Sequence, residues 1–346
     1  MPSGVAVLRR LGLLDAVLAS RAPRLGGVRY THGEGTPLAD APFPPADDGG
    51  APWGLGVRRT TFDSVLVDAL RREPCVTLME GVRADGVLRD AAGSIAGVTT
   101  AQGPLRAGAV IGADGLHSRM RAAAGWAVRP GAPGRYGLAG HWRVAVRDLD
   151  RVTVTFGDGE EWYQCPVGPD LLLVSMLGGR ERVGAAARNY EVAARAALPL
   201  LRDAHLVGRP LAAGQFRQRA RTVAADGMFL VGDAAGYSDP TTGEGIGIGL
   251  LLGERLGARV AALLSGQVER RTAELRHRRD HAQTWRDRNR VTALALMMAR
   301  HPRLSRRAVA RAADRPQALR TLLGINCGYW GFERMSVRDW LTLCGI

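Results

Sequence analysis

Apolar residues recur at helical spacing in two stretches near the start of the chain. The first stretch runs from residue 5 to residue 18, and the second from Thr60 to Arg71. An apolar residue at every third or fourth position gives a helix one apolar stripe, so both stretches are predicted to be helical. Residues 21–50, between them, are rich in glycine, proline and aspartate and are predicted to form long loops.

Short apolar runs bounded by turn residues predict strands in the first half of the chain. They are expected at 53–57, 76–79, 81–87, 95–100 and 109–112. The last of these runs leads directly into Asp114-Gly115. A strand that ends in such a turn is typical of the ligand-binding edge of an α/β protein.

The middle of the chain changes character. Four apolar runs alternate with turns such as Gly157-Asp158-Gly159, which predicts an antiparallel meander. Its strands are expected at 137–146, 151–156, 161–166 and 171–177, followed by a helical stretch at 182–201. After the meander, the pattern predicts a strand at 228–231, a helix at 243–264 and an arginine-rich helical stretch at 269–320.

The strongest candidate for a ligand-binding motif follows the strand predicted at 228–231. The strand leads into Gly232-Asp233-Ala234-Ala235-Gly236, which puts a carboxylate where it can accept a sugar hydroxyl. Pro240 then stiffens a loop that ends at a helix start, where unpaired N–H groups favour an anionic or electron-rich ligand. Glycines at positions 243, 245, 247 and 249 would each cost about 0.5–1 kcal/mol in a helix, relative to alanine. Close approach of a ligand to the backbone is therefore expected; the alternative is that these glycines only let helix and sheet pack tightly.

This run resembles a known family. Gly232 to Gly236, together with Pro240 and Gly243-Glu244-Gly245, looks like the second flavin motif of the FAD-dependent oxidoreductases of the para-hydroxybenzoate hydroxylase and geranylgeranyl reductase superfamily. The resemblance implies that Asp233 holds the ribityl and pyrophosphate side of FAD, and that the loop from Pro240 to Gly245 lies against the isoalloxazine. The cofactor-binding residues that it implies in this run are Gly232, Asp233, Ala234, Pro240, Gly243, Glu244, Gly245 and Ile246.

Two earlier segments carry the same resemblance. The run from Gly112 to Arg121 looks like the family's middle motif, which implies that Asp114 and Gly115 lie near FAD and NAD(P)H. An ordinary Asp-Gly turn is the alternative. Arg59, at the start of the helix predicted at 60–71, resembles the arginine that reaches the phosphate or ribityl region of the cofactor. A solvated arginine is the alternative there, and the adjacent Arg58 is a competitor for the role.

One part of the family pattern is missing. The family opens with a strand, a GxGxxG turn and a helix that binds the ADP pyrophosphate, and no GxGxxG occurs in these 346 residues. Residues 4–13 look like the segment that follows this unit, so about 30 or more residues are expected to be missing. A misassigned start or a fragment is the favoured explanation. The alternative is a shortened protein with a weakened hold on FAD.

The resemblance implies an α/β fold of the FAD/NAD(P)-binding, Rossmann-like, three-layer type, incomplete at the N-terminus and carrying an inserted antiparallel β substrate domain. The FAD-binding domain is expected at 1–136 and 218–264, the substrate domain at 137–217 and a helical region at 265–346. Trp142 and Tyr163, on the meander, are candidates for substrate contact if strand alternation points them inward.

Composition limits the size class of the protein and the reactions that its side chains can perform. A chain of 346 residues exceeds the usual single core, so two joined domains are expected. All 47 basic residues are arginine against 33 acidic residues, a net charge of +14. Without lysine, the chain cannot use a lysine Schiff base or a lysine general base. A GC-rich coding bias is the plain explanation of the charge, and an anionic partner is the alternative. The four cysteines are scattered without a CxxC pair, so a reducing cytoplasm is expected.

The arginine-rich tract from 270 to 320 contains two histidines at metal-ligand spacing. His277 and His281 stand among arginines whose charge opposes a cation, so a solvated basic face is predicted and no metal is expected. Apart from Trp285 the tract has no interleaved aromatic residues, so no nucleic-acid partner is expected. Peripheral contact with an anionic membrane stays open.

The resulting functional prediction is an FAD-dependent oxidoreductase, with a monooxygenase as the favoured type. The resemblance implies that NAD(P)H supplies electrons and that a small aromatic or olefinic substrate is hydroxylated or epoxidised. No acid–base residue is nominated as catalytic, because the cofactor carries the chemistry. Two alternatives remain: a reductase that saturates an isoprenoid chain, in the manner of geranylgeranyl reductase, and a non-catalytic remnant.

Overall fold

The computed structural model describes residues 1–33, 35–45, 50–128, 134–145 and 150–345. Contacts divide the chain into two compact units. The first, here called the sheet unit, comprises residues 1–69, 134–215 and 287–346. The second, here called the motif unit, comprises residues 70–133 and 216–286 and contains the Asp114 and Asp233 turns.

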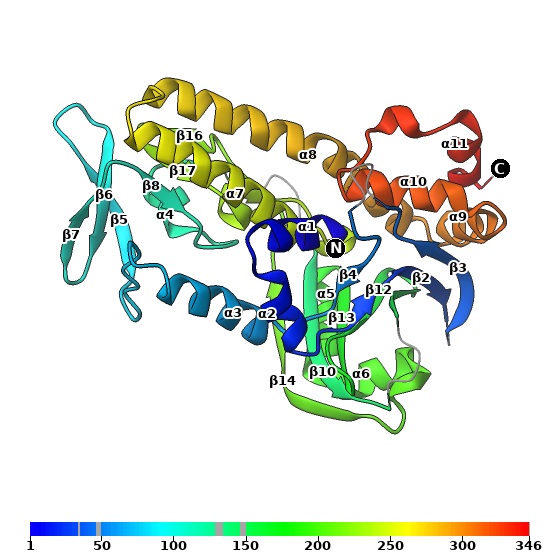
Figure 1. Ribbon diagram of the computed structural model, residues 1–346. Helices are drawn as coiled ribbons and strands as arrows, with labels where there is room; N and C mark the ends of the chain where they lie inside the picture. The colour runs from blue at the N-terminus through cyan, green and yellow to red at the C-terminus, as the bar shows by residue number, and fades with distance from the viewer. Residues whose placement is uncertain (34, 46–49, 129–133, 146–149, 346) are drawn as a thin grey trace. The chain divides into compact units, whose positions relative to one another are not determined.

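A seven-stranded sheet forms the centre of the sheet unit (Figure 1). Its strand order is β14-β10-β13-β12-β11-β2-β3, and all neighbours are antiparallel except β11 and β2. The predicted meander is thus confirmed for the consecutive strands β11, β12 and β13, whereas β10, the first of the four predicted strands, pairs with β13 and not with β11. The strands are β2 (Gly27–His32), β3 (Thr36–Pro42), β10 (Tyr136–Arg143), β11 (Arg151–Phe156), β12 (Glu160–Pro166), β13 (Leu171–Gly178) and β14 (His205–Gly214).

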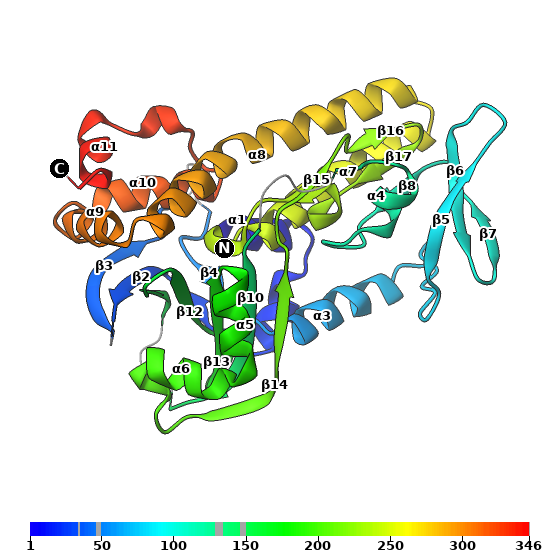
Figure 2. The same ribbon diagram turned by 180° about the vertical axis from the view of Figure 1, so that it is seen from behind.

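Strand alternation gives this sheet two buried faces. Trp142 and Leu172, which are register partners on β10 and β13, point into a core closed by α5 (Arg180–Arg188) and α6 (Tyr190–Ala197). In the rear view α5 lies along β10 and β13, and α6 lies near the lower end of these strands (Figure 2). The helical stretch predicted at 182–201 is correct in type but is divided at Asn189, which caps α6.

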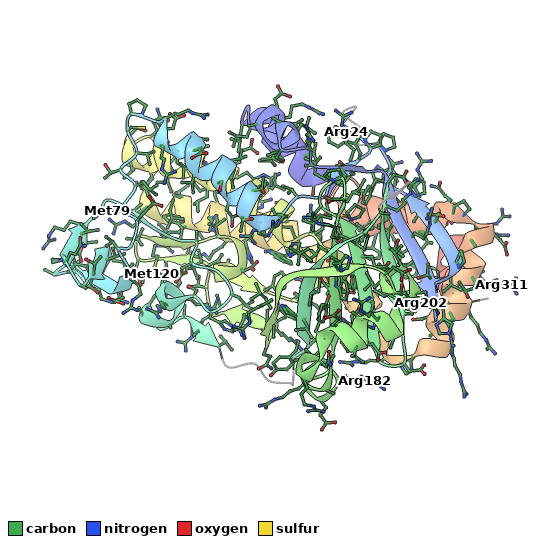
Figure 3. All side chains as sticks on the ribbon, turned by 90° about the horizontal axis from the view of Figure 1, so that it is seen from below. Arg24, Met79, Met120, Arg182, Arg202 and Arg311 are labelled. Carbon is green, nitrogen blue, oxygen red and sulfur yellow. The ribbon has the colours of Figure 1, made fainter. Side chains whose placement is uncertain are left out.

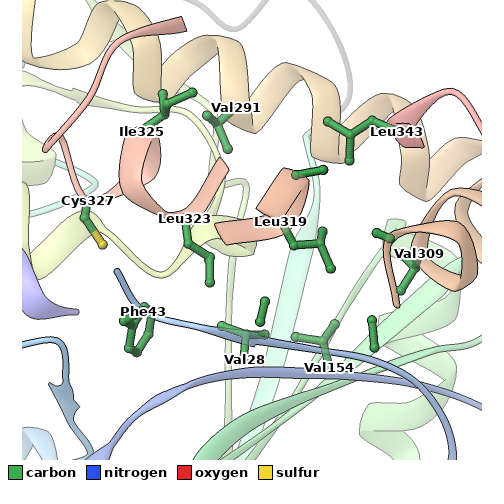
Figure 4. Packing of buried hydrophobic residues seen from close by; sticks show 14 of the residues in the cluster. Val28, Phe43, Val154, Val291, Val309, Leu319, Leu323, Ile325, Cys327 and Leu343 are labelled. Atoms are coloured by element: carbon green, nitrogen blue, oxygen red, sulfur yellow. The ribbon is translucent and has the colours of Figure 1, made fainter. Parts of the chain in front are cut away.

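The opposite face packs on helices from the C-terminal part of the chain. Val28 and Val154 of this face contact a cluster that includes Val291, Leu319 and Leu323 (Figure 4). The helices are α9 (Pro302–Asp314), α10 (Pro316–Asn326) and α11 (Val337–Leu343), preceded by α8 (Arg270–Arg300).

Two predictions for the first 50 residues are wrong. The helix expected over 5–18 is two helices, α1 (Pro2–Arg10) and α2 (Leu14–Ala19), because Gly12 between them has φ +68°. Residues 21–50, expected to be loops, contain β1 (Arg24–Leu25) and the sheet strands β2 and β3. Glycine and proline at the ends of these strands hid their short alternation. The predicted strand at 53–57 is β4 (Gly54–Leu55), and the helix predicted at 60–71 is α3 (Arg59–Arg71).

The motif unit is built on a small sheet of order β16-β17-β8, in which β17 and β8 run parallel. Two further three-stranded sheets have the orders β5-β6-β7 and β18-β15-β9. The strands are β5 (Ala84–Arg89), β6 (Ile95–Thr100), β7 (Gly103–Arg106), β8 (Val110–Gly112), β9 (Ala127–Val128), β15 (Gln218–Ala220), β16 (Ala224–Ala225), β17 (Met228–Leu230) and β18 (Gly236–Tyr237).

The central strand β17 is buried on both faces. Phe229 packs with Ile248 and Leu252 of α7 (Gly245–Leu264), while Met228 and Leu230 pack toward the core that contains Ile95. A short strand with two apolar faces is what a parallel sheet between two layers requires. The fold class is therefore α/β and layered, as predicted.

Of the strands predicted in the motif unit, one is absent and another begins later than predicted. Residues 76–79 form no strand, although 109–112 is confirmed as β8. Val76, Leu78 and Met79 are each exposed, which explains why their apolar character misled the prediction. The strand predicted at 81–87 begins later, at Ala84. Among the described residues, no helix has the length and apolar content that a membrane span requires.

Candidate cofactor-binding site

The two acidic turns predicted to bind FAD lie at the same edge of one sheet. Gly112 of β8 is the register partner of Leu230 of β17, and the Val231 N–H donates to the Gly112 carbonyl at 3.0 Å. Because the strands are parallel, their carboxyl ends point the same way. Asp114 and Asp233 therefore follow neighbouring strand ends.

The Asp114 carboxylate organises the helix that follows it, α4 (Arg119–Ala123). One oxygen accepts from Ser118 Oγ at 2.5 Å, and the other accepts from the backbone N–H groups of Arg119 at 2.6 Å and Met120 at 3.0 Å. Burial alone would raise the pKa of Asp114, but these hydrogen bonds outweigh it, so the pKa is lowered and the carboxylate stays ionised. Asp114 thus has a structural role whether or not it contacts FAD.

Arg121, which was not among the residues predicted for the site, ties the two turns together. Its side chain is buried, and its Nη1 donates to the carbonyl oxygens of Ala234 at 2.8 Å and Asp233 at 3.3 Å. Its Nη2 donates to the Leu116 carbonyl at 2.8 Å. Burial lowers the pKa of Arg121, and the charge of Asp114 works against that change. The signal available in the sequence was its position three residues after the cap Ser118.

Asp233 stands in a 3-10 turn, η2 (Gly232–Ala235), directly after β17. Ala234 and Ala235 are buried beneath the turn, whereas Asp233 is only partly buried. Tyr237 follows on β18, where burial and then the negative charges of Asp233 and Asp239 raise its pKa. The hydroxyl of Tyr237 therefore keeps its proton next to this acidic turn.

Glycines shape the backbone around Asp114 and Asp233. Gly115, Gly232 and Gly243 have φ values of +79°, +60° and +66°, which side chains rarely adopt. A Cβ at any of the three would meet no described atom within 4 Å, so the glycines are there for conformation and leave open space above the turns. Gly245 differs, since a Cβ there would lie 3.1 Å from the ring of Tyr237.

The loop between Asp233 and α7 is held by its own residues. Asp239 caps the turn η3 (Pro240–Thr242) by accepting from the Thr241 N–H at 3.0 Å. Glu244 is buried at the start of α7, and Ile246 is exposed one residue into the helix. The start of α7 packs against η2, which brings its first N–H groups next to the Asp233 turn. The predicted residues 232–246 thus lie together.

His277 and His281 do not form the predicted solvated face. His277 of α8 is fully buried, and its Nε2 lies 2.9 Å from the carbonyl oxygen of Leu230, on the strand that leads to Asp233. Its ring meets Phe229 edge-on. Burial lowers the pKa of both histidines, that of His281 to about 4, so both rings are neutral at pH 7. The prediction is wrong for His277 because helix periodicity turns this position toward β17; His281 is partly buried, and its ring lies 6.2 Å from that of Trp285.

Arg59 belongs to the sheet unit, not to the unit that carries the two acidic turns. Its guanidinium pairs with Asp63 one helical turn later, at 3.1 Å, and both side chains are largely exposed. Contact between Arg59 and a cofactor therefore stays a prediction.

The two substrate candidates on the meander lie on opposite faces of the sheet. Trp142 is fully buried, and its Nε1 donates to the Tyr190 hydroxyl at 3.2 Å. This placement gives Trp142 a packing role and argues against substrate contact. Tyr163 is partly buried on the other face, and its hydroxyl donates to Glu161 at 3.0 Å.

Comparison with known proteins identifies the family. The profile of the FAD binding domain family matches residues 2–289, most of the chain. A digeranylgeranylglycerophospholipid reductase from Methanothrix thermoacetophila is 31% identical over 239 residues. That match covers 64% of this chain and 56% of the reductase, so the chain matches little more than half the length of this relative.

Solved structures share the fold. A flavoprotein/dehydrogenase from Cytophaga hutchinsonii superposes with a TM-score of 0.80 at 18% identity, covering 99% of this chain and 86% of that one. The probable FAD-dependent monooxygenase pqsL from Pseudomonas aeruginosa gives 0.69 at 18% identity, covering 95% and 87%. The flavin-dependent brominase Bmp2 gives 0.76 at 17% identity, covering 98% and 86%. At these identities the likeness concerns the fold alone.

The chain belongs to the FAD binding domain family. Its residues fit that cofactor chemically: a partly exposed carboxylate follows a strand end, open space lies above Gly115, Gly232 and Gly243, and a helix start adjoins them. These are the features that accept sugar hydroxyls and stabilise electron-rich ligand edges.

Proposed function

We propose that the protein is an FAD-dependent monooxygenase that takes electrons from NAD(P)H and hydroxylates or epoxidises a small aromatic or olefinic substrate. The observation that carries the proposal is the pairing of the Asp114 and Asp233 turns at one sheet edge, joined by Arg121, within the residues that match the FAD binding domain family. The location that goes with this proposal is cytoplasmic, which the four free cysteines support.

The residues of this site would each do a limited task. Asp233 would accept a hydroxyl of the cofactor's ribityl chain, and Gly232, Gly243 and the first N–H groups of α7 would border the flavin. Bound FAD would supply the electron and oxygen transfer that amino-acid side chains cannot. Tyr237 stays protonated beside Asp233, so it is a hydroxyl donor in this site.

Substrate contact is proposed for the sheet face that carries Tyr163. On this face His141 and Leu173 are register partners, and Leu173 is in turn the partner of Cys165, so the three form one cross-strand row. His141 and Cys165 are partly exposed. Burial, followed by the charge of Arg58, lowers the pKa of His141, and burial raises the pKa of Cys165 to about 11. Both groups would be neutral toward a substrate at pH 7, which suits an uncharged aromatic or olefinic molecule.

A second candidate function is reduction of an isoprenoid chain. The specific observation in its favour is the 31% identity with the digeranylgeranylglycerophospholipid reductase. Both candidates use the same flavin site and differ in whether O₂ takes part.

Two measurements test the proposal. The purified chain is titrated with FAD, and binding is followed by flavin fluorescence and absorbance; a protein that takes up no FAD would be a non-catalytic remnant. The flavin-loaded protein is then supplied with NADPH or NADH and candidate substrates, in air and without oxygen. Product that needs oxygen supports the monooxygenase, and product formed without oxygen supports the reductase.

A further inference from the structure

The last helix of the sheet unit carries an exposed apolar stripe. Val337, Trp340 and Leu341 of α11 are 76%, 39% and 44% exposed, and Cys344, just after the helix, is also exposed. These positions are spaced i, i+3, i+4 and i+7, so they lie along one side of the helix. Leu343, on another side, is buried, and α11 contacts α9 and α10. The stripe is therefore the outward face of a docked helix.

The stripe is held in a fixed orientation. Ser336 and Asp339 form a reciprocal capping box at the start of α11, with Ser336 Oγ to Asp339 Oδ2 at 2.8 Å. The ring of Trp340 stacks on Phe332 at a centroid distance of 5.8 Å. Ordering an exposed apolar face costs entropy that the free protein does not recover from burial. An ordered apolar surface of this kind marks an interaction site.

A basic cavity of about 390 Å³ adjoins the same helix. Arg315, Arg320 and Arg338 line it, with Gln317 and Ser336. None of the three guanidinium groups has a hydrogen-bond or ion-pair partner among the residues that the structure describes. Asp339, the one acidic residue of the lining, has a carboxylate oxygen engaged by the capping box. The cavity thus presents a surplus of positive charge.

The surrounding helices share this charge. From residue 302 to residue 343 the sequence has eight arginines against three acidic residues. Arg311 of α9 extends away from the helices (Figure 3). Earlier in the basic tract, Arg278 donates to the Ala224 carbonyl and Arg288 to the Cys327 carbonyl, whereas other arginines of α8, such as Arg276 and Arg279, are exposed. What distinguishes α9, α10 and α11 is that their outward basic surface adjoins the apolar stripe.

We propose that α11 and the arginine cavity beside it dock the protein on an anionic phospholipid bilayer. Val337, Trp340 and Leu341 would enter the interfacial layer, where tryptophan and aliphatic side chains are stable, and the three arginines would bind lipid phosphates. Charge complementarity selects this occupant. A second copy would bring arginine against arginine, and a nucleic acid would leave Val337 and Leu341 without an apolar partner. The inference does not depend on the proposed enzymatic function.

The test is co-sedimentation of the full chain with vesicles. One set consists of phosphatidylcholine alone, and the other contains phosphatidylglycerol as one third of the lipid. Binding is expected only to the second set, and it should weaken as ionic strength rises. Failure to sediment with either set, or equal sedimentation with both, would overturn the proposal.

Variants locate the surface. Removing one arginine charge should weaken binding about fivefold, so the triple variant Arg315→Gln, Arg320→Gln, Arg338→Gln should lose it almost completely. The matched control is Arg180→Gln, Arg188→Gln, Arg209→Gln, three exposed arginines of the same unit with the same loss of charge, and it should bind nearly as well as the original chain. Equal loss in both triples would show a non-specific charge effect and refute the assignment.

A second pair tests the apolar stripe. Val337→Ser should weaken vesicle binding several-fold, whereas Leu211→Ser, equally exposed at 75% on β14, should not. Excess inorganic phosphate should compete only weakly, because it lacks the bilayer that holds the stripe. Full displacement by phosphate would show a site for a free anion, and loss of a dimer in Val337→Ser on gel filtration would show a contact between copies; either result refutes the bilayer.

Discussion

The Nη1 atom of Arg121 donates a hydrogen bond of 2.8 Å to the carbonyl oxygen of Ala234. The two residues are 113 positions apart in the sequence: Arg121 lies in α4, which follows the turn after β8, and Ala234 lies in η2, directly after β17. The Nη2 atom of the same guanidinium donates to the carbonyl oxygen of Leu116. One buried guanidinium, here called the Arg121 fork, therefore sets the spacing of the Asp114 and Asp233 turns. This spacing is what a cofactor lying across both strand ends would require.

Replacing Arg121 should therefore affect both stability and flavin binding. Arg121→Ala leaves buried carbonyl oxygens without donors, which should lower the free energy of unfolding by about 2–3 kcal/mol. Urea unfolding measures this loss, and FAD titration should show weaker binding. Arg119→Ala is the control. The Arg119 side chain is largely exposed, and its ion pair with Asp85, at 3.6 Å, lies at the surface. A fully stable Arg121→Ala variant would contradict the role of the fork.

The Asp114 carboxylate should contribute stability through its charge. Asp114→Asn keeps one acceptor oxygen but loses the second, so we expect a loss of about 1–2 kcal/mol. The control Asp63→Asn breaks an exposed ion pair with Arg59 and should cost at most about 0.5 kcal/mol. Because the pKa of Asp114 is lowered by folding, its contribution is complete above the unfolded value and disappears as pH falls through the folded value. The difference between wild type and Asp114→Asn should accordingly shrink in acid.

The sequence predicted the local grouping of residues 232–246 better than it predicted strands β2 and β3. Gly232 to Ile246 could be recognised because a strand, an acidic turn and a helix start are consecutive in the chain. The link through Arg121 could not, because it joins segments more than a hundred residues apart and a buried arginine looks like any other arginine in a chain with 47 basic residues. Strands β2 and β3 were missed for a similar reason: β3 packs against α9 and α10, and Val28 of β2 belongs to the same core cluster as residues of these helices, which occur much later in the sequence.

The histidines of α8 should make the protein sensitive to mild acid. Burial, and then the charge of His277, lowers the pKa of His281 to about 4, below the value of about 6.5 for an unfolded histidine. Between these values the unfolded chain binds a proton that the folded chain does not, so stability falls as pH drops from about 6.5 toward 4. The slope per ring is at most about 1.4 kcal/mol per pH unit. His281→Gln should therefore flatten the profile in urea unfolding, and an unchanged slope would mean that His281 titrates normally.

Two glycines near the N-terminal half of α7 should respond oppositely to alanine. Gly243 has φ +66°, so Gly243→Ala should cost about 1–2 kcal/mol and weaken FAD binding. Gly253 lies within the helix, and a Cβ there would meet no described atom within 4 Å, so Gly253→Ala should raise stability by about 0.5–1 kcal/mol. Thermal unfolding with and without FAD measures both effects. Similar behaviour of the two variants would show that backbone conformation at Gly243 is not what the site needs.

Trp142 and Tyr163 should separate packing from substrate contact. Trp142→Phe loses the hydrogen bond to Tyr190 and leaves a small void, so it should lower the free energy of unfolding by about 1–3 kcal/mol without changing which substrates are used. Tyr163→Phe removes one hydroxyl that donates to Glu161, while Arg135 still pairs with Glu161 at 2.7 Å. Its stability should change by less than about 1.5 kcal/mol, and the effect should appear in KM for the substrate. If KM moved with Trp142→Phe and stayed constant with Tyr163→Phe, the substrate would have to meet the other face of the sheet.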